Sequence, residues 1–397
     1  MQDSQRFVPS WATQIFPSQV RSTPILPSLP TCFVNIDERV LKVLLHLESN
    51  QYVGIIGMGG SGKTTLTKAI LHHVYRDFEA TSFVGNMKDS NNVLDIQRHL
   101  LKDLKCEKII TNIDQGSKYL KHTLENKKVF VVLDDIGSQE QLHALVSPTM
   151  LFASGSKMIA TSRNWQDLKT IIPEKGKMEM ELFDKEQAKE LFYKHAFPHQ
   201  QPQHPDFEKV ANKIIEACSG SPLSLEVLGS YLCGVQNLRV WNAALQRLRK
   251  GKYLSGSQEN DRIWRTLRIS YDNLNEEEKE IFLDIACFFC RDVLPNGMQE
   301  EMALRIWDCS EVEAELAFLN LKDRSLVQIN KDGTLAMHDQ LRDMGRMIAC
   351  QERSEKPRIW NTQELERIVH AQTMVNNDQL FIFYSSCFNT IKCIYLM

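Results

Sequence analysis

The sequence has no excess of charge of either sign. Its 47 lysines and arginines nearly balance its 50 aspartates and glutamates, so the net charge is only −3. Proteins that attract nucleic acid or acidic membranes through broad electrostatics carry a basic excess. We therefore expect neither nucleic acid nor a membrane as a binding partner.

The chain also has no N-terminal signal peptide and no regular cysteine framework. Its ten cysteines lie at irregular spacings, which predicts reduced thiols and a cytoplasmic location, with the nucleus as the alternative. Cys287 and Cys290 form a C-x-x-C pair without a second pair at the spacing of a zinc site. Because their neighbours are apolar, we interpret both as small buried hydrophobic residues.

The two ends differ in composition from the middle. Residues 1–32 combine Pro, Ser and Gln without a periodic apolar pattern, which predicts a disordered leader. We assign residues 351–397 to a C-terminal tail whose last part, Leu380 to Met397, is apolar and aromatic. Lys392 and several polar residues there disfavour a membrane anchor. We interpret this part as a stretch separated from its partner or as an artefact of the sequence end.

The most informative segment reads G-I-I-G-M-G-G-S-G-K-T-T and follows the apolar run Tyr52 to Ile56. This is the phosphate-loop pattern, in which glycines let the backbone approach and the next helix directs its N–H groups at phosphates. We expect Lys63 to reach the β- and γ-phosphates and assist catalysis, and Thr64 to bind Mg²⁺. The predicted nucleotide-contacting residues of the loop are Gly57, Gly59, Gly60, Ser61, Gly62, Lys63, Thr64 and Thr65.

Short apolar strands alternate with helices after the loop. Val129 to Leu133 ends in Asp134-Asp135, and Lys157 to Thr161 ends in Ser162-Arg163. This alternation predicts a parallel sheet with helices on both faces, that is, an α/β P-loop NTPase domain. Ligands bind at the carboxyl ends of such strands, where the loop and these polar residues should meet.

The polar residues at the strand ends have separate predicted roles. Asp134 should hold Mg²⁺, and Asp135 should orient a water molecule as a catalytic residue. Arg163 should sense the γ-phosphate through charge-assisted hydrogen bonds. The alternatives are an aspartate pair that caps the next helix and a surface salt bridge for Arg163.

The second half of the chain is mainly helical. A helix, a strand, a turn at Asp332-Gly333 and a second strand predict a winged-helix domain towards its end. We place the P-loop domain at 33–180, a small helical domain at 181–255 and the winged-helix domain at 256–350. Within the helical domain we expect the histidines to be solvated rather than to bind a metal; they are His195, His199 and His204.

In this order the motifs resemble those of the NB-ARC module of plant disease-resistance proteins, in the subgroup with an N-terminal TIR domain. They are Gly57–Thr65, Lys128–Ile136, Gly155–Arg163, Gly220–Leu223, Phe282–Phe289 and Met337–Asp339. No room for a TIR domain precedes residue 33, and no leucine-rich repeat period follows residue 360. We therefore expect a truncated member of that family, in which Asn35, Gly137 and Ser221 depart from the usual residues.

The resemblance implies a molecular switch of plant innate immunity rather than an enzyme. Such proteins hold ADP when resting and ATP with Mg²⁺ when active, and at most hydrolyse ATP slowly. The resemblance implies that Pro222 packs on the adenine and that His338 contacts the β-phosphate. It also implies full-length immune receptors or other signalling proteins as partners, and oligomerisation with ATP.

Two other functions remain open from the sequence. A rapidly cycling P-loop ATPase would use the same nucleotide residues. A nucleic-acid-binding regulator would use the winged helix, whose basic residues are interleaved with acidic ones. The arginines concerned are Arg265, Arg268, Arg305, Arg324, Arg342 and Arg346.

Overall fold

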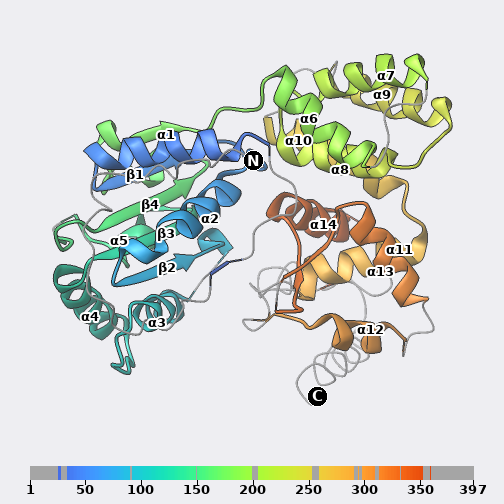
Figure 1. The fold of residues 1–397 in the computed structure, drawn as a ribbon. Coiled ribbons are helices and arrows are strands. Elements are labelled where there is room, and N and C mark those ends of the chain that lie inside the picture. The colour runs from blue at the N-terminus through green and yellow to red at the C-terminus, as the bar shows by residue number, and fades with distance from the viewer. Residues whose placement is uncertain are drawn as a thin grey trace, which may run out of the picture.

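The computed structural model describes residues 26–27, 34–89, 92–148, 150–198, 204–252, 259–289, 294, 297–308, 313–330, 332–351 and 358. Nearly all of the predicted leader and tail therefore lies outside the described residues, as do Cys290 and His199. The described chain forms an α/β part, a helical part and a C-terminal part that contains two short strands (Figure 1).

A parallel sheet lies at the centre of the α/β part, as predicted, and it contains five strands. Its strand order is β2-β3-β4-β1-β5. The strands are β1 (Tyr52–Ile56), β2 (Ala80–Val84), β3 (Val129–Ile136), β4 (Lys157–Ser162) and β5 (Lys177–Glu179). β3 runs past the predicted end at Leu133, and its register against β4 shifts between Leu133 and Ile136. The shift lies at the aspartate pair.

Helices cover both faces of the sheet. Phe130 and Val132 of β3 pack under α1 and α2, whereas the alternate residues Val129 and Val131 face α3, α4 and α5. Every residue of β3 is buried, which explains its unbroken apolar run. The helices are α1 (Ile36–Ser49), α2 (Lys63–Val74), α3 (Val93–Asp103), α4 (Ile113–Asn126) and α5 (Gln139–His143).

Four helices form the helical part around a core that contains Phe192 and Trp241, whose rings meet edge to face at 6.2 Å. They are α6 (Lys185–Ala196), α7 (Pro205–Ala217), α8 (Pro222–Leu232) and α9 (Leu238–Lys252). α8 packs in two directions, because Leu225 belongs to this core whereas Leu223 belongs to the core of the C-terminal part. The helix therefore joins the two parts.

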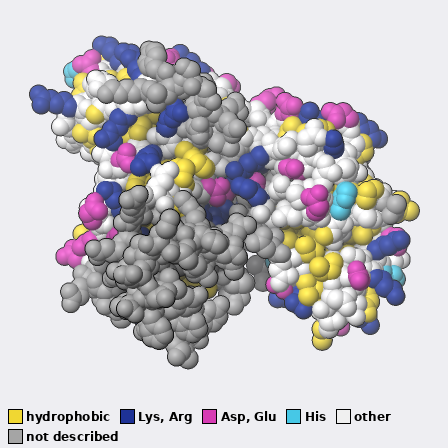
Figure 2. Space-filling view, turned by 180° about the vertical axis from the view of Figure 1, so that it is seen from behind, with side chains coloured by type: hydrophobic (Ala, Val, Ile, Leu, Met, Phe, Trp, Pro, Cys, Tyr) yellow, Lys and Arg dark blue, Asp and Glu magenta, His cyan; other side chains and the backbone are white. Residues whose placement is uncertain are grey.

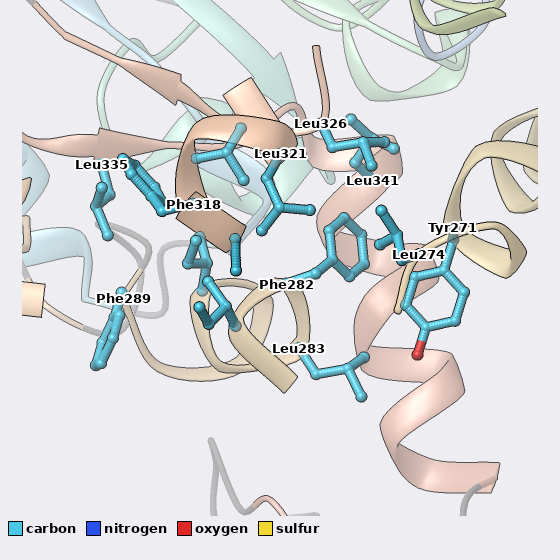
Figure 3. Close-up of a cluster of buried hydrophobic side chains, with 14 of the residues drawn as sticks. Tyr271, Leu274, Phe282, Leu283, Phe289, Phe318, Leu321, Leu326, Leu335 and Leu341 are labelled. Atoms are coloured by element: carbon cyan, nitrogen blue, oxygen red, sulfur yellow. The ribbon is translucent and has the colours of Figure 1, made fainter. Parts of the chain in front are cut away.

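The C-terminal part has the helices and the antiparallel strand pair of a winged helix. Its helices are α10 (Glu259–Asp272), α11 (Glu276–Asp284) with a π-helical turn (Ile285–Phe289), α12 (Glu300–Asp308), α13 (Ala314–Asp323) and α14 (Asp339–Gln351). The strands are β6 (Gln328–Ile329) and β7 (Leu335–Ala336). Figure 3 shows Phe282 and Leu341 in one apolar cluster, which fixes the start of α14 against α11.

The histidines of the helical part differ from the expectation in one case. His195 is half-buried, and its Nδ1 lies 3.2 Å from Ser230 Oγ, so the prediction of a solvated side chain was wrong there. Burial also lowers the pKa of His195. His204 is exposed, and its Nδ1 accepts the backbone N–H of Asp206 at the start of α7.

We predict that Phe282→Ala destabilises the C-terminal part by about 3–5 kcal/mol, because a fully buried aromatic ring is lost. Its ring lies 5.2 Å from that of Tyr271. Urea titration followed by hydrogen exchange of α11 and α14 measures the change. Leu316→Ala is the control, because Leu316 is 56% exposed and should change the midpoint little. Equal effects of the two substitutions would contradict the assigned core.

Candidate nucleotide-binding site

The phosphate loop connects β1 to α2. Gly60 and Gly62 have φ values of 73° and 94°, which favour glycine. The first hydrogen bond of α2 runs from Leu66 N to Gly62 O at 2.9 Å. The backbone N–H groups of the first helical turn lack intrahelical acceptors, so they can bind an anion. No acidic residue lies in that turn.

Lys63 is held within the loop. Its Nζ donates to Gly57 O at 2.7 Å and to Met58 O at 2.9 Å. The side chain is buried, and burial lowers the pKa of Lys63 although nearby carboxylates act in the opposite sense. A phosphate oxygen can replace the two carbonyl oxygens as a stronger partner for the ammonium group.

Asp134 and Thr64 meet at the end of β3. The hydroxyls of Thr64 and Thr161 both donate to the Asp134 carboxylate at 2.7 Å. Asp134 is fully buried, and burial raises its pKa to about 6. A carboxylate and a hydroxyl are the oxygen ligands that Mg²⁺ prefers, and a cation would stabilise the buried charge. These residues therefore fit a Mg²⁺ site. The sequence reasoning missed Thr161, although it is the residue at the predicted end of β4.

Asp135 has an unusual backbone conformation, with φ at 56°. Its N–H donates to Thr161 Oγ1 at 2.9 Å, and its carboxylate lies 3.4 Å from an Arg163 guanidinium nitrogen. The aspartate pair therefore contacts the next strand and does not cap α5, where Ser138 is the cap. The predicted catalytic residue is paired with an arginine in this conformation.

Arg163 links the α/β part to α14. Its NH2 donates to Asp339 Oδ2 at 2.6 Å, and its NH1 lies 3.9 Å from Asp343. Burial would lower the pKa of Arg163, but Asp135, Asp339 and Asp343 raise it. Lys88 approaches Asp343 at 3.6 Å. Sequence reasoning missed Asp343, although its position four residues after Asp339 places both on one face of a helix.

His338 precedes α14 and caps it. Its Nδ1 accepts the backbone N–H of Gln340 at 3.1 Å, and this nitrogen also lies 3.4 Å from Asp339 Oδ1. Burial lowers the pKa of His338. When the ring is neutral, the hydrogen bond that Nδ1 accepts leaves the ring proton on Nε2. Burial alone would raise the pKa of Asp339, but His338, Arg163 and Arg342 lower it. The Nε2–H group is thus the donor available for a phosphate.

The start of α8 contacts the loop from the other side. Leu223 N donates to Gly60 O at 3.4 Å, and a Cβ on Gly60 would lie 3.0 Å from Leu223 Cβ. Pro222 is the first residue of this helix. The structure therefore brings the predicted loop, strand-end and α14 residues together and places Pro222 beside them.

The departures from the family pattern are compatible with the local structure. Asn35 has φ at 50°, a left-handed conformation that asparagine tolerates almost as glycine does. The Ser221 hydroxyl accepts the Ser224 N–H at 3.4 Å and caps α8. A Cβ on Gly137 would lie 2.9 Å from Lys88 Cγ, so aspartate there would require Lys88 to move.

Three of the winged-helix arginines bond to or are buried within the protein, whereas Arg268 and Arg305 are exposed. Arg342 is buried, Arg346 donates to Ala286 O, and Arg324 donates to Asn273 O. On the face drawn in Figure 2, basic and acidic side chains are interspersed over the described residues. This distribution gives no support to broad electrostatic binding of nucleic acid.

Two kinds of feature are absent from the described residues. No helix in this part of the chain is both long and apolar enough to cross a membrane. No group of three or more His, Cys, Asp or Glu residues there could hold a metal ion by itself. The candidate Mg²⁺ site differs from such a group, because it combines one aspartate with a hydroxyl and would include phosphate oxygens.

The chain is similar to two protein-family models and to plant resistance proteins. The model of the NB-ARC domain matches residues 35–202, and that of a Roq1-like disease-resistance winged-helix domain matches residues 275–354. Disease resistance protein RUN1 of Vitis rotundifolia is 33% identical over 352 residues, covering 85% of this chain and 25% of that protein. TMV resistance protein N of Nicotiana glutinosa is 32% identical, covering 86% of this chain and 30% of that protein.

The chain thus spans about a quarter to a third of the length of these relatives. Its fold is similar to that of a signal transduction ATPase with numerous domains and a tetratricopeptide repeat sensor from Pyrococcus horikoshii. The TM-score is 0.51 and the identity 13%, covering 88% of this chain and 52% of the other. The predicted fold class and family resemblance are confirmed: residues 35–202 belong to the NB-ARC domain family, and residues 275–354 belong to the Roq1-like disease-resistance winged-helix family.

Proposed function

We propose that this chain is a nucleotide-dependent switch in plant defence signalling, with ADP bound in the resting state and ATP in the active state. The phosphate loop and the named resistance proteins among its relatives support the proposal. A cytoplasmic location and partner proteins of the immune-receptor type follow from the same proposal. ATP would also favour self-association.

The ion pair between Arg163 and Asp339 is the observation that carries the proposal. It joins the end of β4 to the start of α14 at 2.6 Å, inside the site that contains the phosphate loop. A γ-phosphate that reached Arg163 would compete with Asp339 for the guanidinium group. We call the conformation in which Arg163 contacts Asp339 of α14 the closed conformation. ATP would therefore destabilise it, whereas ADP lacks the competing γ-phosphate.

Hydrolysis in the closed conformation should be slow. Asp135 is the candidate for orienting water, but its carboxylate lies 3.4 Å from Arg163. A carboxylate oxygen that contacts a guanidinium group is less available to orient a water molecule. Mg²⁺ held by Thr64 and Asp134 would neutralise phosphate charge. Nucleotide exchange, rather than rapid turnover, is thus the proposed means of switching.

We predict that Lys63→Arg abolishes ADP binding while the fold is retained. The planar guanidinium group does not fit a pocket in which a compact ammonium bonds two loop carbonyls. Isothermal titration measures the affinity, and circular dichroism checks the fold. Lys118→Arg, at an exposed position on α4, should bind ADP like the parent. Retained affinity in Lys63→Arg would overturn the loop assignment.

We predict that Asp134→Asn makes ADP affinity independent of Mg²⁺, because the charged metal ligand is removed while its size is kept. ADP titrations in Mg²⁺ and in EDTA measure the difference for parent and variant. The parent should bind more tightly in Mg²⁺. A Mg²⁺ effect of the same size in the variant would remove Asp134 from the metal site.

We predict that Asp339→Asn accelerates ADP release about tenfold, which corresponds to about 1.4 kcal/mol of closed-state preference. The variant loses the charge that bonds Arg163 at 2.6 Å. Stopped-flow displacement of a fluorescent ADP analogue measures the rate. Asp343→Asn is the control on the same helix, and its effect should be smaller because its contact with Arg163 is 3.9 Å. An unchanged rate in Asp339→Asn would refute the role of the ion pair.

A further inference from the structure

Gln340 is a fully buried polar residue beside the phosphate loop. Its Oε1 accepts the indole N–H of Trp264 at 3.1 Å. Its Nε2 is buried and has no hydrogen-bond partner among the residues that the structure describes. The next residue, Leu341, lies in the apolar core of the C-terminal part (Figure 3), which fixes the backbone at this point.

The orientation of the amide follows from its partner. An indole nitrogen can only donate a hydrogen bond, so the oxygen of Gln340 must face Trp264. The NH₂ group consequently faces Gly59, where an added Cβ would clash with Nε2. Gly59 is thus the residue that lets the amide contact the loop backbone. Ser61 Oγ, in the same loop, is also buried without a partner in the described chain.

A buried N–H donor without an acceptor destabilises a protein relative to an apolar side chain of the same shape. The missing partner must be an acceptor, since the NH₂ group has only hydrogens to offer. Lys63 and the backbone N–H groups in the first turn of α2 make the surrounding site favourable for an anion. Phosphate oxygens are hydrogen-bond acceptors and carry negative charge, so they meet both requirements.

We propose that Gln340 is a nucleotide-binding residue whose Nε2 donates to the phosphate chain of a bound nucleoside diphosphate. Trp264 is its positioning residue, because it holds the amide oxygen away from the phosphates. The inference rests on the proposed nucleotide-binding function. Since Gln340 belongs to α14, the contact forms only when the C-terminal part closes on the loop, and bound ADP therefore stabilises closure directly.

The test compares ADP affinity and nucleotide-free stability in two glutamine variants. Gln340→Met keeps the length of the side chain and should weaken ADP binding about tenfold, or about 1.4 kcal/mol. In the Trp264→Phe background, Gln340→Met should not lower the melting temperature of the nucleotide-free protein, because the side-chain amide then has no hydrogen bond in the described structure to lose. Gln97→Met is the matched control: Gln97 is also fully buried, but its Nε2 donates to Ser117 Oγ and Ala144 O. It should lower the melting temperature and leave ADP affinity unchanged.

Trp264→Phe provides a second variant that keeps an aromatic ring but removes the indole donor. As a single variant it should weaken ADP binding. In the Gln340→Met background it should have no further effect on ADP affinity, because Trp264 affects the nucleotide only by orienting the Gln340 side-chain amide. Unchanged ADP affinity in both single variants, with normal binding by the parent, would overturn the role of Gln340 alone. Failure of the parent to bind ADP would instead refute the proposed function.

Discussion

The contact between Arg163 and Asp339 connects two parts of the chain that are built on separate cores. Arg163 follows β4, whose residues Met158 and Ile159 are buried on opposite faces of the sheet. Asp339 begins α14, which is fixed by Leu341 in the C-terminal core. Each core positions one partner, so a movement of α14 relative to the sheet must separate the two charges. The ion pair is therefore tied to the relative position of the two parts.

The charges around the Arg163–Asp339 ion pair explain why a bound nucleotide could weaken that ion pair. Asp134, Asp135, Asp339 and Asp343 lie near Arg163 and Lys63. Besides burial, charges in this group shift the pKa values of Lys63, Asp134, Arg163 and Asp339. The γ-phosphate of ATP, which ADP lacks, would add negative charge to a site that is already rich in carboxylates. Mg²⁺ at Thr64 and Asp134 would compensate part of it. Under the proposed function, the remaining negative charge would favour separation of the α14 carboxylates from the sheet, which is the proposed opening.

Much of the α/β part could be predicted, because each of its strands has a recognisable pattern within a short stretch of sequence. β1 to β4 are apolar runs, and polar residues that follow such strands must gather at one edge of a parallel sheet. This explains why Asp134 and Arg163 were placed near the phosphate loop. β5 could not be recognised, because Lys177–Glu179 has a short sequence with two charged residues and an incompletely buried side-chain pattern.

The contacts of α14 could not be derived from spacing alone. Arg163 and Asp339 are separated by 176 residues, so only the packing of the C-terminal part brings them together. His338 entered the predicted site through the family resemblance, and its Nε2–H form follows only from the hydrogen bond to Gln340 N. His195 shows the same limit: we expected a solvated side chain, whereas the packing of α6 on α8 half-buries the ring beside Ser230.

Hydrogen–deuterium exchange at the start of α14 tests the central claim most directly. The backbone N–H of Gln340 donates a hydrogen bond to His338 Nδ1 in the closed conformation. The backbone N–H groups in the core of α11 serve as an internal reference. With ADP and Mg²⁺, the first turn of α14 should be protected. With a non-hydrolysable ATP analogue and Mg²⁺, its exchange should accelerate while α11 stays protected. Identical exchange of α14 with both nucleotides, at saturating occupancy, would contradict a switch controlled at this contact.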